Sequence, residues 1–144
     1  TDIDWAYQVV VHFTGMSPDL NQMLELRLEN DNTNQEVDRV KLGTIPSADF
    51  DVTIIGTKLN TEYKVEFYAD HNGNGLYDAP PTDHAWLLIF ENMSGDVELD
   101  FAHNTNFTDI NWKYLLSMDL MNMVPHLGQL FELRVVDIND NSEI

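Results

Sequence analysis

The sequence contains no cysteine, few basic residues and no long apolar run. Without cysteine there is no disulfide, no zinc–thiolate site and no cysteine nucleophile. Seven Lys and Arg residues stand against 25 Asp and Glu residues, which gives a formal net charge of −18. This charge argues against nucleic acid and anionic membrane surfaces as partners, because their phosphates are bound by Lys and Arg. No apolar stretch approaches the roughly 18 residues of a spanning helix, so we expect no membrane span.

The sequence also lacks the short motifs of common enzyme classes. It has no G-x-S-x-G, no H-E-x-x-H, no phosphate-binding loop and no dinucleotide fingerprint. Its acidic pairs, such as Asp49 with Asp51 and Glu62 with Glu66, alternate along expected strands and are typical of faces in water. We therefore predict that the protein is not an enzyme.

What the sequence does contain, first, is an internal repeat with a period of 107 residues. Thr1-Asp2-Ile3-x-Trp5-x-Tyr7 recurs as Thr108-Asp109-Ile110-x-Trp112-x-Tyr114, and 15 of the 37 overlapping pairs are identical without a gap. The period matches the length of one β-sandwich domain. We therefore expect residues 1–107 to form one complete unit. Residues 108–144 would be the opening third of a second unit, which cannot bury its own apolar face.

Seven segments show the alternation and the β-branched or aromatic runs of strands, between turn signals. The expected strands are 7–13, 23–29, 36–42, 50–55, 62–69, 85–90 and 97–101, and strands over 114–120 and 130–136 would repeat the first two. The predicted fold class is all-β: a seven-stranded immunoglobulin-like antiparallel β-sandwich, plus the first two strands of a second repeat. In the fifth strand the alternation predicts one buried face and one face in water.

One helical alternative exists for residues 112–123, where Leu, Met and Lys favour an amphipathic helix. The aligned segment of the first repeat, 5–16, contains three consecutive valines, which make a poor helix centre. We therefore expect a strand here.

The segment with the clearest chemistry is the loop 70–83, between the fifth and sixth expected strands. Oxygen-bearing side chains stand at its alternate positions, a glycine follows them, and two further carboxylates come later. Calcium takes six to eight oxygen ligands, and alternate residues of a tightly curled loop direct their oxygens inward. The predicted Ca²⁺ ligands are Asp70, Asn72, Asn74, Leu76, Asp78 and Asp83.

This run resembles the D-x-[DN]-x-[DN]-G calcium loop of EF-hands, dockerins and thrombospondin type 3 repeats. The resemblance implies three side-chain ligands, a turn glycine and a carbonyl ligand, which are Asp70, Asn72, Asn74, Gly75 and Leu76 respectively. At the twelfth position Pro81 stands where EF-hands have a bidentate Glu, so Asp78 and Asp83 are the available carboxylates. The alternative is an Asn-Gly-rich turn without an ion, but a plain turn does not need 14 residues.

The histidines and methionines allow two other metal interpretations. His71 and His84 bracket the loop and His103 follows the last strand, so the three could share a transition-metal site, although exposed or hydrogen-bonded loop histidines are the simpler interpretation. A soft copper site could form from Met118, Met121, Met123 and His126. Methionines that fill gaps in a core are the simpler interpretation of this second group.

Trp5 and Trp112 occupy equivalent positions in the two repeats. We expect them to pack in a core or between domains, with a carbohydrate platform as the lesser alternative. Trp86, at the head of an apolar strand, is expected in the core.

The acidic charge, the absence of cysteine, the tandem sandwich pattern and the Asp/Asn/Gly loop together resemble the repeat modules of secreted bacterial surface proteins, such as adhesins and filament proteins. The resemblance implies an extracellular, cell-surface, non-catalytic structural or adhesive repeat stiffened by Ca²⁺. Residues 112–144 could pair with neighbouring repeats or with other copies of the chain by strand addition. The alternative is a carbohydrate- or copper-binding β-sandwich module.

Overall fold

The computed structural model describes residues 6–57, 62–91, 95–114, 116 and 118–143. The chain divides into two compact units, 1–112 and 113–144. The first unit extends past the end of the 107-residue sequence period, because the segment up to Trp112 packs on it.

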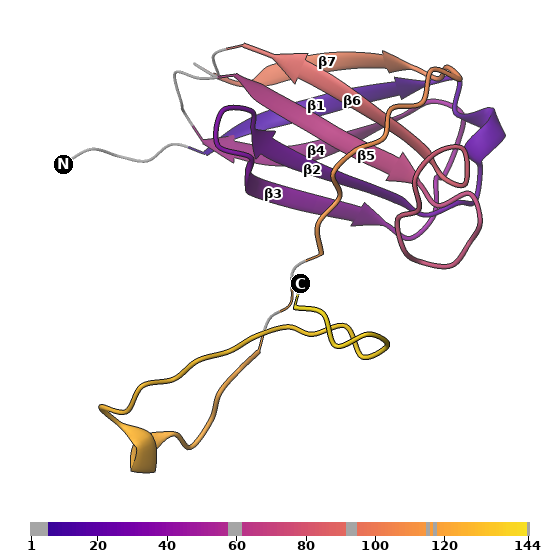
Figure 1. Cartoon of the computed structure of the whole chain (residues 1–144). Helices are drawn as coiled ribbons and strands as arrows, with labels where there is room; N and C mark the ends of the chain where they lie inside the picture. The colour runs from indigo at the N-terminus through magenta and orange to yellow at the C-terminus, as the bar shows by residue number, and fades with distance from the viewer. Residues whose placement is uncertain (1–5, 58–61, 92–94, 115, 117, 144) are drawn as a thin grey trace. The chain divides into compact units, whose positions relative to one another are not determined.

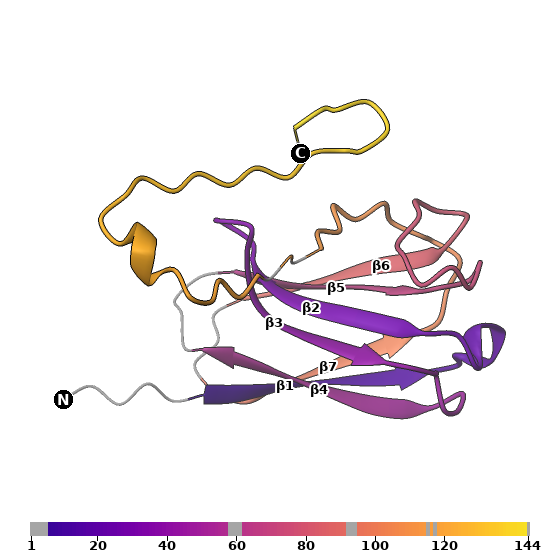
Figure 2. The ribbon, with the colours of Figure 1, turned by 90° about the horizontal axis from the view of Figure 1, so that it is seen from below.

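The first unit is the predicted seven-stranded β-sandwich, and each expected strand is present (Figure 1). The strands are β1 (Ala6–Thr14), β2 (Leu24–Asn30), β3 (Gln35–Leu42), β4 (Phe50–Thr57), β5 (Tyr63–Ala69), β6 (His84–Phe90) and β7 (Val97–Ala102). A short 3₁₀ helix, η1 (Ser17–Asp19), follows β1. Figure 2 shows the two layers, with β1, β4 and β7 on one side and β2, β3, β5 and β6 on the other.

The strand order is β4-β1-β7 in one sheet and β3-β2-β5-β6 in the other. The β1–β7 pair is parallel, with Val9 opposite Val97 and Thr14 opposite Ala102, whereas the other described pairs are antiparallel. In a constant-type immunoglobulin domain the first strand pairs with the second. Here β1 pairs with β4 and β7, so antiparallel pairing was correctly predicted for every described pair except this one.

The core lies between the sheets and follows the period-two pattern of the strands. Its fully buried members include Val9, Val11 and Phe13 of β1. Phe67 of β5 packs edge-on against Phe13 and Phe101, with ring centroids 5.2 and 4.9 Å apart. Edge-to-face pairs at this spacing add to the energy of burial. Trp86 is also buried in this core, as predicted.

The prediction that one face of β5 lies in water is wrong. Tyr68 and Glu66 point to the outer face of the four-stranded sheet, yet both are buried. The reason is a cover: after β7 the chain runs along the outer side of β5 and β6, drawn in orange in Figure 2. The Trp112 ring lies 4.9 Å from the Tyr68 ring, and Glu66 pairs with the buried Arg27.

In the second unit, 113–144, the expected strands over 114–120 and 130–136 are absent from the described residues. The regular features there are the 3₁₀ helix η2 (Val124–His126) and an isolated bridge between Val136 and Glu143. The described part of 112–123 contains no helix either. In the first unit β1 is held by β4 and β7, and β2 by β3 and β5. The second unit contains no counterparts of β4, β5 and β7, so its segments lack the partners that a ladder requires.

The turns of the second unit nevertheless reproduce those of the first at the 107-residue period. The helices η1 and η2 are such a pair. Positive φ angles recur at three aligned pairs, which are Gly15 (71°) and Asn122 (58°), Asn21 (66°) and Gly128 (78°), and Asn34 (55°) and Asn141 (60°). Glycine and asparagine interchange at these positions because they tolerate the left-handed region best. The duplication is therefore visible in the backbone as well as in the sequence.

Candidate functional site

The loop from Asp70 to Asp83 joins β5 to β6 and has a buried carboxylate at each end. Asp70 and Asp83 are both buried, whereas most of the residues between them are exposed. Burying a carboxylate costs free energy unless hydrogen bonds or a cation compensate it. The partners of these two groups therefore determine how the loop is held.

Asp70 organises the first half of the loop. Its carboxylate accepts hydrogen bonds from the backbone N–H groups of Gly73, Asn74 and Gly75, at 2.8, 3.2 and 2.7 Å. Gly73 and Gly75 have φ angles of 72° and 80°, a region that side chains rarely adopt. This geometry explains why glycines stand at these two positions and wraps the chain tightly around one carboxylate.

Asp83 closes the loop from the other end. It accepts hydrogen bonds from the backbone N–H groups of His71 at 3.0 Å and Asp78 at 2.8 Å, with a longer contact to Asn72. Burial raises the pKa of Asp83, and these backbone hydrogen bonds oppose the rise. Asp83 therefore connects the two halves of the loop.

Asp78 lies where the predicted ligands converge. One of its oxygens accepts hydrogen bonds from the side-chain amides of Asn72 and Asn74, both at 2.7 Å. The amide oxygens of the same two residues accept backbone N–H groups of Asn74 and Leu76. Three oxygen-bearing side chains at alternate positions thus meet at one point, next to the turn that Asp70 caps.

The predicted Ca²⁺ ligands therefore fall into two groups. Asn72, Asn74 and Asp78 meet through their side chains, and Asp70 is joined to them through the backbone N–H group of Asn74. The backbone of Leu76 belongs to the same turn, while its side chain is exposed. Asp83 is engaged by three backbone N–H groups. The described hydrogen bonds therefore place it as an internal brace of the loop.

The same loop reaches the beginning of the second repeat through Tyr77. The Tyr77 hydroxyl donates to the Asp109 carboxylate at 2.7 Å and accepts the backbone N–H of Ile110 at 3.0 Å. Burial, followed by the hydrogen bond to Asp109, raises the pKa of Tyr77. The loop is thus tied to the residues that open the next sequence repeat.

Residues 108–112 are docked on the outer face of the four-stranded sheet. Ile110 and Trp112 are buried there against Tyr68 and Ala85. The Trp112 ring lies 5.1 Å from the guanidinium carbon of Arg27 and 4.6 Å from that of Arg39, within the range of cation–π contacts. Backbone bonds from Thr108 to Ala85 and from Arg27 to Asn111 complete the attachment.

This arrangement gives the packing role predicted for Trp112. A carbohydrate platform needs an open aromatic face, but the Trp112 ring contacts two guanidinium groups and a tyrosine. Trp5, the equivalent residue of the first repeat, lies outside the described residues.

A second polar cluster lies at the same end of the sandwich. Asp19, at the end of η1, is fully buried. Its two carboxylate oxygens lie 2.6 Å from Nδ1 of His84 and 3.1 Å from Nε2 of His103. The His71 ring stacks on the His84 ring at 4.3 Å, and its Nδ1 lies 3.1 Å from the amide nitrogen of Gln22.

The shared histidine site is thus partly realised, with a carboxylate that sequence reasoning missed. Asp19 is separated from His84 by 65 residues and from His103 by 84, so only the fold brings the three together. The Ser-Pro-Asp turn that carries Asp19 has no metal-binding spacing of its own. In the second repeat the aligned residue is His126, so the repeat comparison did not single out Asp19 either.

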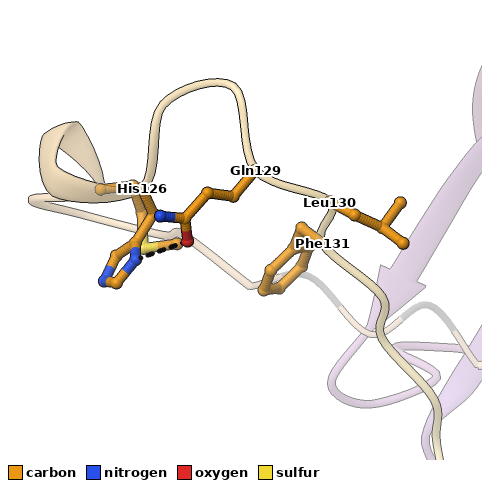
Figure 3. A pocket seen from close by; sticks show the side chains of 5 residues that line it. His126, Gln129, Leu130 and Phe131 are labelled. Atoms are coloured by element: carbon orange, nitrogen blue, oxygen red, sulfur yellow. Dashed lines mark hydrogen bonds between the residues drawn. The ribbon is translucent and has the colours of Figure 1, made fainter.

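The copper interpretation receives little structural support. Met123 and His126 line one pocket of about 270 Å³ together with Gln129, Leu130 and Phe131. The His126 imidazole in this pocket is hydrogen-bonded to the Gln129 side chain at 3.0 Å (Figure 3). Met118 and Met121, the other two candidates, are exposed, so a gathered sulfur cluster is not found among the described residues.

Comparison of the chain with protein-family models, with curated proteins and with solved structures gave no match. Fold and site therefore define the chain as a seven-stranded β-sandwich that carries a polar loop and a docked repeat junction. Among the described residues, none of the helices is long and apolar enough to cross a membrane.

Proposed function

We propose that this chain is a calcium-stabilised, non-catalytic structural or adhesive repeat module of a secreted cell-surface or fibre-forming protein. The observation that carries the proposal is the convergence of Asn72, Asn74 and Asp78 beside the turn capped by Asp70. Oxygen ligands at alternate positions of a tight loop are what a hard divalent cation binds.

Calcium would act on this loop by neutralising its carboxylates and ordering its exposed part. The two asparagine amides now donate to Asp78. With a cation present, the oxygens of the three side chains would turn toward the ion, and the carbonyl of Leu76 would be available beside them. Two asparagines among the ligands leave the site with few negative charges, which favours the modest affinity of extracellular modules. Such affinity suits a compartment where Ca²⁺ is abundant.

The loop also gives calcium a way to stiffen the joint between repeats. Tyr77 stands one residue before Asp78 and hydrogen-bonds Asp109 and Ile110. Ordering the loop would hold Tyr77 in place, and Tyr77 would hold the segment 108–112 on the sheet. We propose that Ca²⁺ thereby fixes the exit direction of the chain from each sandwich. A rigid joint is the property that a stalk or fibre of repeats requires.

The partner of residues 113–144 is proposed to be a set of strands like β4, β5 and β7. The segment carries the apolar pattern of β1 and β2, but Leu116, Leu133 and their neighbours are exposed. Strand addition from a neighbouring repeat or from another copy of the chain would bury this pattern. The same partners would supply the ladder hydrogen bonds that the segment lacks.

Thermal unfolding with Ca²⁺ and with a chelator tests the proposed function. A ligand at ten times its Kd stabilises a protein by about 1.4 kcal/mol, which raises Tm of a domain of this size by about 5 °C. The rise should be lost in Asp78→Ala and in Asp70→Ala. The matched control is Asp119→Ala, which removes the same charge from an exposed position of the second unit.

Asp78→Ala is the more informative variant, because Asp70 also caps the turn without any ion. An equal Tm with Ca²⁺ and with chelator in the unmodified protein would refute the proposal. So would a calcium-dependent rise that survives in Asp78→Ala.

A further inference from the structure

The geometry points to a second metal site, for a divalent transition-metal ion, formed by Asp19, His84 and His103. The three residues offer one carboxylate and two imidazole donors that lie within 4.8 Å of one another. They belong to η1, to the start of β6 and to the segment after β7. The site is separate from the calcium loop and does not depend on the proposed function.

The first argument is unsatisfied polarity in a buried place. Asp19 is fully buried, and its Oδ2 atom has no hydrogen-bond partner among the described residues. The same holds for Nε2 of His103, although the two atoms lie only 3.1 Å apart. Close contact without hydrogen-bond alignment leaves both groups uncompensated, and buried polar atoms of this kind need an explanation such as an ion.

The second argument is the fit of the distances. Zinc binds imidazole nitrogen and carboxylate oxygen at about 2.0–2.2 Å, so adjacent ligand atoms in a tetrahedral site lie roughly 3.3 Å apart. The observed separations from Asp19 are 2.6 Å to His84 and 3.1 Å to His103. Shifts of a few tenths of an ångström would admit an ion, which would replace the proton between His84 and Asp19.

The donor set determines the class of ion. Two imidazoles and one carboxylate suit Zn²⁺, Co²⁺, Ni²⁺ or Cu²⁺, whereas Ca²⁺ takes oxygen ligands. Three protein ligands leave one position for a water molecule. The ion would join η1 and β6 to the segment after β7, and would thereby connect the two sheets at one end of the sandwich.

Zinc titration by calorimetry tests the site, with excess Ca²⁺ present to occupy the loop. His12 lies near the exposed Asp51 and Glu98 and is a source of weak surface binding, so all variants carry His12→Gln. We expect one Zn²⁺ per chain in this background. Replacing a ligand by His103→Gln or His84→Gln should weaken binding at least about tenfold, since even outer-shell changes cost that much.

Two readouts make the result unambiguous. Co²⁺ should give the visible absorption of a four-coordinate nitrogen–oxygen site, and His103→Gln should abolish it. Asp78→Ala should leave Zn²⁺ binding unchanged, which separates this site from the calcium loop. Absence of Zn²⁺ binding in the His12→Gln protein would overturn the inference, and so would unchanged affinity in a folded His103→Gln variant.

Discussion

Residues 6–30 and 113–137 follow one sequence pattern but have different structures. In the first region Leu26 is fully buried, while its counterpart Leu133 is 60 % exposed. Val11 is fully buried, and its counterpart Met118 is 53 % exposed. The turns of the two regions agree, whereas the strands form only where partner strands are present. Turns in this protein are thus encoded locally, and strands depend on long-range pairing.

The agreement of the turns extends to individual hydrogen bonds. The backbone N–H of Asp19 donates to Met16 at 3.0 Å, and that of His126 donates to Met123 at 2.9 Å. The Asn34 and Asn141 N–H groups each donate four residues back at 2.8 Å. The bridge between Val136 and Glu143 matches the pairing of Glu29 with Glu36 in the first unit. The second region therefore holds the hairpin nucleus of a strand pair without the rest of its sheet.

The strongest way to break the contrast is to supply the missing partners. A fusion of a second copy of residues 38–107 after Ile144 continues the repeat in register. We expect residues 130–136 to become strand and their amide hydrogens to exchange more slowly by over about 10³-fold, for a unit of about 5 kcal/mol stability. Hydrogen exchange followed by mass spectrometry would measure this. Fast exchange in a soluble fusion protein would mean that these residues do not encode a strand pair.

The next largest effect comes from matched core truncations. Leu26→Ala should lower the free energy of unfolding by about 2–5 kcal/mol, because it leaves a cavity between the sheets. Leu133→Ala should change it by less than about 0.5 kcal/mol, as exposed substitutions do. Urea unfolding of the two variants would measure both values. Similar losses in both would show that Leu133 has a buried environment in solution.

A smaller effect is expected at the repeat junction. Tyr77→Phe should cost about 1 kcal/mol, because it removes the hydroxyl that binds Asp109 and Ile110. The raised pKa of Tyr77 means that the stability it contributes is present below the ordinary pKa of 10 and is lost as the pH rises through the raised value. Asp109→Asn should lower this pKa in a spectrophotometric titration. A Tyr77 that ionises near pH 10 in the unmodified protein would contradict the described junction.

The smallest effect is electrostatic and exposed. The hydrogen bond from Asp51 to His12, at 2.7 Å, raises the pKa of His12. The pair should stabilise the first unit below pH 6.5, the ordinary histidine value, and this contribution should fade as the pH rises through the raised pKa. Histidine titration by NMR should show His12 returning toward its ordinary value in Asp51→Asn. An unchanged His12 titration would rule out this pair as the cause.

Much of this fold follows from sequence patterns, and the exceptions share one cause. Alternation located all seven strands of the first unit, and the spacing of acidic and amide residues marked the loop that Asp70 and Asp83 bracket. Alternation shows which face of a strand is apolar, but not what covers the other face. Glu66 was therefore placed in water, although the segment ending at Trp112 buries it. The parallel partner of β1 and the position of Asp19 beside two histidines were missed for the same reason, since distant segments create both.

The most direct test of the account is calcium binding to the intact protein, measured by isothermal titration calorimetry in metal-free buffer. The account predicts one Ca²⁺ per chain with a Kd of about 10⁻⁴–10⁻³ M, typical of extracellular modules. It also predicts loss of that binding in Asp78→Ala and retention in Asp119→Ala. A folded, unmodified chain that takes up no Ca²⁺ at millimolar concentrations would contradict the central claim.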